Sequence, residues 1–272
     1  KRQRDMADIH QLAIVDSTAE LADDVVVGPF CVIGPRVKIG AGTRLENNVT
    51  ICANVTVGEN NHFHPGVVIG GEPQDVSYQG TETLTFVGDN NVLREGVTVN
   101  RASEKEDGIT SIGDNCFIMA CGHVAHDCKV GNHVVMANAT LLGGHVHVHD
   151  HANLSGGVAV HHFTTIGSYS FVGGLSRVIH DVPPYMLADG NPARPRCINI
   201  VALKRNDFTR EQISALADAH RMMYRAKVGM EHAREFLRAN TQLLECVENL
   251  LNFVQTQQGG RHGRGRDGRR AA

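Results

Sequence analysis

The sequence predicts a mainly β protein, a solenoid of short parallel strands with an α-helical subdomain near its C-terminal end. Three observations lead to this fold class. Aliphatic residues recur at every sixth position over most of the chain. Glycine is abundant, at 29 of 272 residues, while aromatic residues make up only 5%. A helical hydrophobic pattern is found only after about residue 203.

The six-residue period runs in three stretches. The first begins at Val15 and ends at Ile69, with an apolar residue at each of ten consecutive positions. The period breaks over 71–86, resumes from Val87 to Val99, breaks again over the charged segment 103–110, and then continues to Val178. A helix would require spacings of three and four, and an ordinary strand a spacing of two. A period of six therefore indicates a solenoid in which each short strand contributes one inward aliphatic side chain before a turn.

Pro and Gly positions and the change of period predict the domain organisation. Thr209 and Gln212 predict a capping box at the start of a helix, and the Arg/Gly-rich C-terminal segment has a composition that cannot bury a core. We expect five segments, namely an N-terminal lead-in over 1–13, the solenoid over 14–180, an irregular connector over 181–202, an α-helical subdomain over 203–256 and a disordered tail over 257–272.

Composition and charge exclude several classes of protein. The net charge of −3 does not suit a nucleic-acid-binding protein. No run of about 18 apolar residues is present, so we expect no stable membrane insertion and a cytoplasmic location. The seven cysteines are odd in number and form no CxxC pair, which argues against a disulfide framework and against a thiolate zinc site.

Three strands of six residues make a coil of eighteen, and this converts sequence spacing into spatial adjacency. Residues eighteen apart lie in neighbouring coils, about 4.8 Å from one another. His126, Gly144 and His162 each follow an inward aliphatic residue by two positions and are predicted to form one column. Asp127 and His145 belong to the next column, so His126 and His145 are predicted to lie within side-chain reach.

This part of the chain is rich in histidine, and the residues alone leave its role open. Most turn histidines are solvated surface residues. A histidine cluster that crosses coils could also bind Zn²⁺, or it could act as an acid/base site, because imidazole titrates near neutral pH.

The segment His123-Val124-Ala125-His126-Asp127-Cys128, with Gly143-Gly144-His145 one coil later, closely resembles the UDP-N-acetylglucosamine acyltransferases of lipid A biosynthesis. The resemblance covers about residues 9–225. It implies a trimeric, left-handed parallel β-helix of hexapeptide repeats. The activity it implies is the first step of lipid A biosynthesis, in which a 3-hydroxyacyl chain passes from acyl carrier protein to the 3-hydroxyl of UDP-N-acetylglucosamine.

The resemblance also implies roles for individual residues. His126 would be the general base, Asp127 would orient its imidazole, and Gly144 would offer a backbone N–H to the oxyanion. Asn199 and Arg205 would reach the uridine diphosphate from a neighbouring subunit. No cofactor or metal and no covalent enzyme intermediate is required. The residues expected to contact the substrate are Asp75, His123, His145, His161, His162, Asn199 and Arg205.

Five positions depart from the family pattern, and they keep alternatives open. The departures are His162 for Gln, Ser77 for Lys, Pro192 for His, Val201 for Glu and Asn206 for Arg. One alternative is N-acylation of a 3-amino UDP-sugar analogue. Others are a γ-carbonic-anhydrase-like zinc enzyme on the same fold and a non-enzymatic scaffold with a degenerate site.

The acyl carrier protein is acidic, so a basic surface is expected to receive it. The basic residues expected to form it are Lys204, Arg205, Arg210, Arg221, Arg225 and Lys227.

Overall fold

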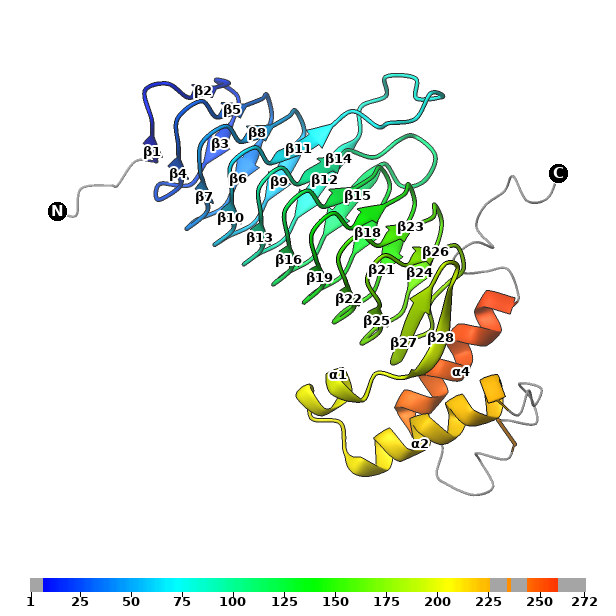
Figure 1. The fold of residues 1–272 in the computed structure, drawn as a ribbon. Helices are drawn as coiled ribbons and strands as arrows, with labels where there is room; N and C mark the ends of the chain where they lie inside the picture. The colour runs from blue at the N-terminus through cyan, green and yellow to red at the C-terminus, as the bar shows by residue number, and fades with distance from the viewer. Residues whose placement is uncertain (1–6, 226–233, 236–243, 259–272) are drawn as a thin grey trace.

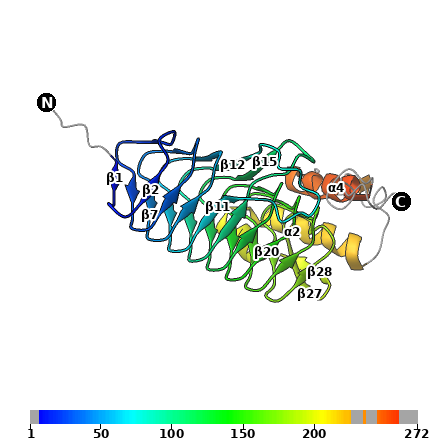
Figure 2. The same cartoon turned by 90° about the horizontal axis from the view of Figure 1, so that it is seen from above.

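The computed structural model shows a left-handed parallel β-helix with three flat sides, which carries α-helices at its C-terminal end (Figure 1). The structure describes residues 7–225, 234–235 and 244–258. Figure 2, a view from above, shows the coils stacked in sequence order from β1 to β28. The predicted fold class, a solenoid of short parallel strands followed by helices, is confirmed.

Each side of the solenoid is one sheet, which we name A, B or C. Sheet A contains β1 (Asp8–Ile9), β4 (Val26–Val27), β7 (Arg44–Leu45), β10 (His62–Phe63), β13 (Val92–Leu93), β16 (Phe117–Ile118), β19 (Val135–Met136), β22 (Asn153–Leu154), β25 (Phe171–Val172), β27 (Met186–Gly190) and β28 (Ala193–Ile198). Sheet B contains β2 (Ile14–Val15), β5 (Val32–Ile33), β8 (Thr50–Ile51), β11 (Val68–Gly71), β14 (Thr98–Asn100), β17 (His123–Val124), β20 (Leu141–Leu142), β23 (Ala159–Val160) and β26 (Arg177–Val178). Sheet C contains β3 (Glu20–Leu21), β6 (Lys38–Ile39), β9 (Val55–Val57), β12 (Leu84–Val87), β15 (Ile109–Ile112), β18 (Lys129–Val130), β21 (His147–Val148) and β24 (Thr165–Ile166).

The aliphatic period forms the core. From Val27 to Val178, the side chains at the six-residue spacing, including that of Phe63, are all at most 4% exposed. Strands of neighbouring coils pair in register, so that Leu45 of β7 lies between Val27 of β4 and Phe63 of β10. Backbone hydrogen bonds close the gap between coils, for example from the Gly28 N–H to the Leu45 carbonyl at 2.9 Å.

The two interruptions of the period are loops on one corner of the solenoid. Residues 72–83 connect β11 to β12, and residues 101–108 connect β14 to β15, so both loops lead from sheet B to sheet C. The loop 72–83 is shorter than the break 71–86, and the loop 101–108 ends before the break 103–110 does, because the buried residues Thr85 and Thr110 already belong to the strands that follow. Figure 1 shows the two loops projecting from the same edge.

The segment 181–202, predicted as an irregular connector, is in fact largely regular. Strand β27 extends sheet A in parallel with β25, and β28 turns back to pair with β27 in antiparallel fashion. The prolines are compatible with these strands because Pro192 lies in the turn between them and Pro195 lies in β28, the last strand of the sheet.

The helices pack on one another beyond β28. They are α1 (Ile200–Arg205), α2 (Arg210–His220), the π-helical turn η1 (Arg221–Arg225) and α4 (Glu245–Gln258). The predicted capping box is present, because the Thr209 hydroxyl accepts from the Gln212 N–H and the Gln212 side chain accepts from the Thr209 N–H. Leu216 of α2 and Leu250 and Leu251 of α4 are fully buried in their common core, together with Met186 of β27.

Some sequence-based expectations concern residues outside the described part of the chain. These are residues 1–6 of the lead-in, residues 226–233 (with Lys227) and 236–243 of the predicted helical subdomain, and residues 259–272 of the predicted tail. Among the helices that the structure describes, none has the length and apolar character needed to cross a bilayer.

The core predicts a sharp contrast between two adjacent leucines. Leu142 points into the solenoid and is 1% exposed, whereas Leu141 points outward and is 46% exposed. We expect Leu142→Ala to lower the free energy of unfolding by about 2–5 kcal/mol through the lost burial and the cavity left behind. Leu141→Ala is the matched control and should cost less than about 1 kcal/mol. Urea unfolding at a fixed protein concentration measures both, and equal losses would contradict the inward assignment.

Candidate active site

The corner that follows β17 carries two ionisable side chains that point toward each other. Asp127 adopts a left-handed backbone conformation, with φ of 60°, and this turn brings its carboxylate beside the preceding residue. His126 Nδ1 lies 2.7 Å from Asp127 Oδ2. His126 is 8% exposed and Asp127 is fully buried, so the pair is held with little access for water.

The buried Asp127 carboxylate is satisfied by donors from the loop 101–108. It accepts hydrogen bonds from the Ser103 hydroxyl at 2.6 Å and from the Ser103 N–H at 3.1 Å. Burial alone would raise the pKa of Asp127, but the hydrogen bonds from His126 and Ser103 outweigh it, and the pKa is lower than usual. Asp127 is therefore a carboxylate at neutral pH, and it can accept only if His126 carries its proton on Nδ1.

Gly144 lies directly against His126 in the next coil. A Cβ atom added at Gly144 would lie 2.6 Å from His126 Cε1 and 2.7 Å from His126 Nε2, so only glycine leaves room for the ring. Among the described residues, none accepts a hydrogen bond from the Gly144 N–H. The predicted column is thus confirmed, and the Gly144 backbone lies beside the nitrogen of His126 that Asp127 does not engage.

His145 completes the corner. Its ring meets that of His126 edge to face, with 5.1 Å between centroids, and it stacks on Phe163 at 4.3 Å. The prediction that His126 and His145 lie within reach of each other is confirmed. His145 Nδ1 also lies 3.2 Å from Glu106 Oε1, so the second loop supplies an acid to this ring as well.

A cavity of about 530 Å³ opens over this corner. The side of the solenoid contributes His126, Gly143, Gly144, His145, His162 and Phe163, and the loops contribute Gln74, Asp75, Val76 and Lys105. Lys105 forms an ion pair with Asp75 and lies 2.7 Å from Ser77 Oγ. The hydrogen bonds from Lys105 and from the Ser77 N–H hold the pKa of Asp75 well below its usual range. The structure therefore brings five of the predicted residues, Asp75, His126, Gly144, His145 and His162, to one cavity.

His123 and His161 lie beside this cavity and do not line it. His123 Nδ1 lies 2.8 Å from Thr98 Oγ1, and burial, with a smaller effect of His126, lowers the pKa of His123. The His161 ring lies 3.8 Å from that of His162. His123 and His161 are thus next to the site, and a ligand would contact them only by extending past the side chains that line the cavity.

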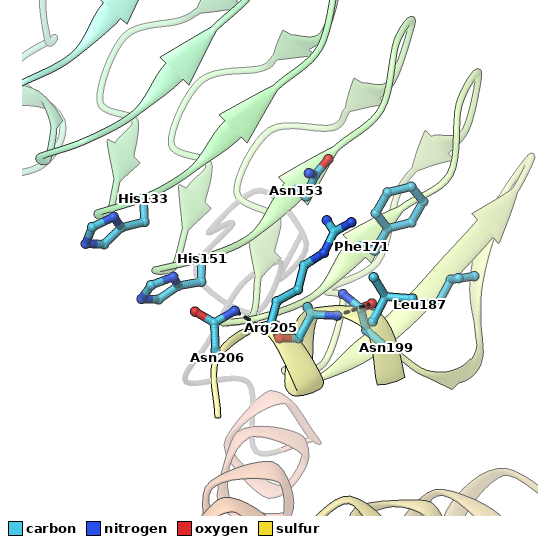
Figure 3. A pocket seen from close by; sticks show the side chains of 10 residues that line it. His133, His151, Asn153, Phe171, Leu187, Asn199, Arg205 and Asn206 are labelled. Carbon is cyan, nitrogen blue, oxygen red and sulfur yellow. Dashed lines mark hydrogen bonds between the residues drawn. The ribbon is translucent and has the colours of Figure 1, made fainter. Parts of the chain in front are cut away.

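Asn199 and Arg205 line a different cavity, of about 340 Å³, between sheet A and α1 (Figure 3). Within one chain they are not brought to His126. Asn199 has a structural role of its own, because its Nδ2 donates to the Tyr169 carbonyl and its Oδ1 accepts from the Ala202 N–H at the start of α1. Arg205 points from α1 into this cavity. Val201 and Asn206, two of the residues that depart from the family pattern, also line it.

The donor atoms of His126, Asp127 and His145 lie within 4.8 Å of one another, so the corner has the geometry to hold a metal ion. The set contains two histidines, however, whereas the carbonic anhydrase alternative requires three. His162 does not belong to this group, and the Asp127 carboxylate is already satisfied by His126 and Ser103.

Comparison with known proteins decides between the alternatives. The proteins named acyl-[acyl-carrier-protein]–UDP-N-acetylglucosamine O-acyltransferase from Syntrophobacter fumaroxidans and Thermodesulfovibrio yellowstonii are 45% and 44% identical to this chain. The alignments cover 93% and 94% of this chain and 98% and 99% of those proteins. The chain belongs to the UDP-N-acetylglucosamine O-acyltransferase family.

Family models and solved structures agree with this assignment. Residues 181–265 match a model described as UDP N-acetylglucosamine O-acyltransferase, domain 2, and residues 18–53 and 36–71 match the bacterial transferase hexapeptide model. The UDP-N-acetylglucosamine acyltransferase of Francisella novicida has a TM-score of 0.87 at 37% identity, with 91% of each chain covered. That of Arabidopsis has a TM-score of 0.82 at 34% identity, with 94% of this chain and 99% of that chain covered. The family's O-acyltransferase names give no support to the N-acylation or zinc-enzyme alternatives.

The sequence did not reveal the residues that support the His126–Asp127 pair and its neighbours Asp75 and His145. Ser103, Lys105 and Glu106 all lie in the charged segment that breaks the aliphatic period, and Thr110 accepts from the Asp127 N–H at 2.8 Å. One signal could have located them. The break follows Val99, which occupies the same column as Val124, so the break falls on the same corner one coil before His126.

The low pKa of Asp75 makes its contribution to stability depend on pH. A carboxyl whose pKa is depressed on folding stabilises the folded state above its ordinary pKa of about 4, and this stabilisation is lost as the pH falls toward the folded-state value. We expect Asp75→Asn to be less stable than the wild type at pH 7, with a difference that shrinks below about pH 4. Urea unfolding between pH 7 and about pH 3 measures this.

Glu104→Gln is the matched control, since Glu104 is an exposed carboxylate of the neighbouring loop. Its difference from the wild type should stay small throughout. A deficit of Asp75→Asn that is constant with pH would contradict the ion pair with Lys105.

Proposed function

We propose that this protein transfers a 3-hydroxyacyl chain from acyl carrier protein to the 3-hydroxyl of UDP-N-acetylglucosamine, with His126 as general base. The reaction is the first step of lipid A biosynthesis, and we place it in the bacterial cytoplasm. The observation that carries the proposal is the buried His126–Asp127 pair facing Gly144 in the cavity of a chain that belongs to the O-acyltransferase family.

The hydrogen bonds of the corner indicate which nitrogen of His126 can accept and return the proton. Asp127 accepts from His126 Nδ1, so Nε2 carries the free electron pair. Nε2 takes the proton of the sugar 3-hydroxyl as that oxygen attacks the thioester carbonyl. When the carbon–sulfur bond breaks, the same nitrogen gives this proton to the departing thiolate, which leaves as the carrier thiol. Asp127 stays ionised and stabilises the imidazolium that forms between these two steps.

The Gly144 backbone would stabilise the negative charge on the carbonyl oxygen. The Gly144 backbone lies against His126 because no side chain separates them. A donor fixed by the backbone needs no reorganisation when the tetrahedral intermediate forms. Asp75 from the loop and His145 and His162 from the solenoid would bind the sugar nucleotide between them. His123 and His161 would lie behind these residues.

The proposed nucleotide site is shared between subunits of a homotrimer. Asn199 and Arg205 line a separate cavity in one chain, so their contribution to a site at His126 has to come from a neighbouring copy. In a closed three-fold arrangement, each of these cavities would lie against another subunit. The guanidinium of Arg205 has the fork geometry that suits a diphosphate.

The basic residues of the helical region would receive the acidic carrier protein. Lys204, Arg210 and Arg221 are exposed on α1, α2 and η1. Arg221 also pairs with Asp218 at 2.6 Å, which reduces its contribution to binding the carrier protein. The side chain of Arg225 and all of Lys227 fall outside the described residues.

Removal of the base tests the reaction. We expect His126→Ala to lower the transfer of 3-hydroxyacyl chains by at least about a hundredfold, the lower range for losing a general base. Asp127→Asn should also be strongly impaired, because it no longer offers a charged acceptor that fixes the imidazole. The assay combines 3-hydroxyacyl carrier protein with UDP-N-acetylglucosamine and follows the acylated sugar nucleotide.

His10→Ala is the control, since His10 is exposed in the first coil and should leave activity unchanged. Full activity of His126→Ala would overturn the proposed mechanism. If the wild type were inactive, the 3-amino sugar would be the next acceptor to test, and inactivity with both would favour a scaffold.

Mixed subunits test the shared site. His126→Ala and Arg205→Ala should each be nearly inactive alone. Co-expressed with different affinity tags and purified through both, they should regain activity, because some sites then combine an intact His126 with an intact Arg205 of another chain. No recovery in verified mixed oligomers, or a monomer by light scattering, would rule out the shared site.

A further inference from the structure

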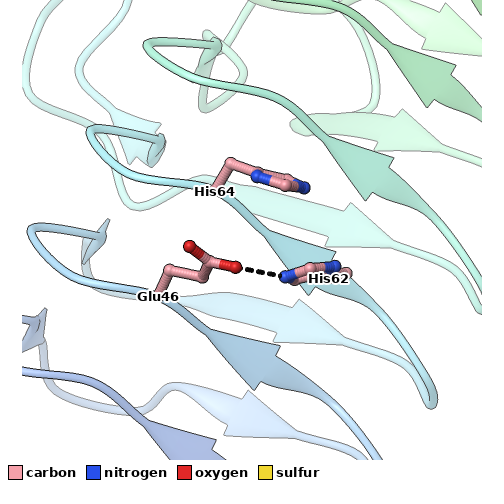
Figure 4. Close-up of side chains that lie close together, drawn as sticks. All are labelled: Glu46, His62 and His64. Atoms are coloured by element: carbon pink, nitrogen blue, oxygen red, sulfur yellow. Dashed lines mark hydrogen bonds and ion pairs between the residues drawn. The ribbon is translucent and has the colours of Figure 1, made fainter.

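A cluster of three potential metal ligands lies on sheet A, several coils before the catalytic corner. It consists of Glu46, which follows β7, and of His62 and His64, which lie in and just after β10. The strands β7 and β10 pair in parallel, with Leu45 opposite the inward Phe63. Because side chains alternate along a strand, His62 and His64 flank Phe63 and both point outward. Figure 4 shows the three side chains gathered on the same face.

We propose that Glu46, His62 and His64 bind a divalent transition-metal ion such as Zn²⁺, at a site separate from the catalytic corner. One donor atom from each residue lies within 4.8 Å of the others. His62 Nε2 and Glu46 Oε1 are 2.8 Å apart, and the two imidazole rings are 4.3 Å apart. In a tetrahedral site with bonds of about 2.0–2.2 Å, donor atoms are about 3.3 Å apart. The donor atoms of His62 and Glu46 are slightly closer than this, and all three donor atoms lie within 4.8 Å of one another, so side-chain rotations of modest size close the site.

The donor types favour zinc and its neighbours over calcium or magnesium. Imidazole nitrogen suits Zn²⁺, Co²⁺, Ni²⁺ and Cu²⁺, whereas Ca²⁺ and Mg²⁺ prefer oxygen ligands. Two histidines and one glutamate leave a tetrahedral ion one further position, open to water or to another carboxylate. The side chains of His62 and Glu46 are 37% and 32% exposed, so an ion can reach them from solvent.

A second carboxylate borders the cluster. Glu95 Oε1 lies 3.6 Å from His64 Nδ1, and Arg94 holds Glu95 with hydrogen bonds of 2.9 and 3.1 Å. A carboxylate beside a ligating histidine fixes the orientation of its ring and strengthens the ligand. The four residues therefore combine two histidines with two acids, one of which is already positioned by an arginine.

The site is built on the rigid part of the fold. The Glu46 N–H donates to the Phe63 carbonyl at 2.9 Å, and the His64 N–H donates to the Leu93 carbonyl at 2.9 Å. Phe63 between the two histidines is fully buried. An ion bound here would link two adjacent coils, and since it binds the folded chain alone, it would raise thermal stability.

Zinc binding to the metal-free protein tests this proposal. We expect isothermal titration with ZnCl₂ to give one site per chain, and each of Glu46→Gln, His62→Ala and His64→Ala to weaken it by at least about tenfold. Zn²⁺ should raise the midpoint of thermal unfolding of the wild type and not that of His64→Ala. Co²⁺ in place of Zn²⁺ should show the visible absorption of a tetrahedral complex.

Two controls separate this site from other histidines. The double variant His133→Ala/His151→Ala removes a stacked histidine pair with 4.6 Å between its rings, and it should bind zinc like the wild type. His126→Ala disrupts the corner group and should also retain the site, so failure of the proposed function would not affect this result. Circular dichroism of each variant verifies folding. Zinc binding that persists in His62→Ala and His64→Ala, or that is lost in His126→Ala, would overturn the proposal.

Discussion

The backbone hydrogen bonds between neighbouring coils are the constraint on which the rest of this structure depends. Most strands are only two residues long, so no strand is stable by itself and each is defined by the coils above and below it. The inward aliphatic side chains keep this register because a shift of one residue would expose them. Register then determines which side chains stack outside. His126 meets Gly144, and Glu46 meets His64, for the same reason that Leu45 meets Phe63.

The corner at His126 and Asp127 shows how this ladder tolerates a buried charge. Asp127 is fully buried, which would be costly if its carboxylate were unpaired. The loop 101–108 leaves the solenoid one coil earlier and brings Ser103 to that carboxylate, while the loop 72–83 adds Asp75 on the far side of the cavity. The two departures from the repeat therefore support the two functions that a plain coil could not provide, namely charge stabilisation and a second wall for the cavity.

The sequence predicted what the period controls and failed where the period stops. The inward residues, the columns of His126 and Asp127 and the capping box at Thr209 were all predictable from spacing. The strand pair β27–β28 was not, because its residues carry prolines that resemble loop signals, and its pairing depends on an open edge at β25. Ser103 and Glu106 were also missed, since their partners are distant in sequence and nothing in a polar stretch indicates which way it folds. The separation of Asn199 and Arg205 from His126 is visible only in three dimensions.

The eighteen-residue coil limits which insertions and deletions the fold can accept, much as a reading frame limits those in a gene. An insertion of one residue within a coil would move every later residue to a different position around the solenoid, turning buried side chains outward and dispersing the columns. Insertions that leave and return at one corner, as 72–83 and 101–108 do, preserve the frame. We therefore expect homologues of different length to differ at corners, or by whole coils. Whole coils can be gained or lost before β7 without altering either group of side chains.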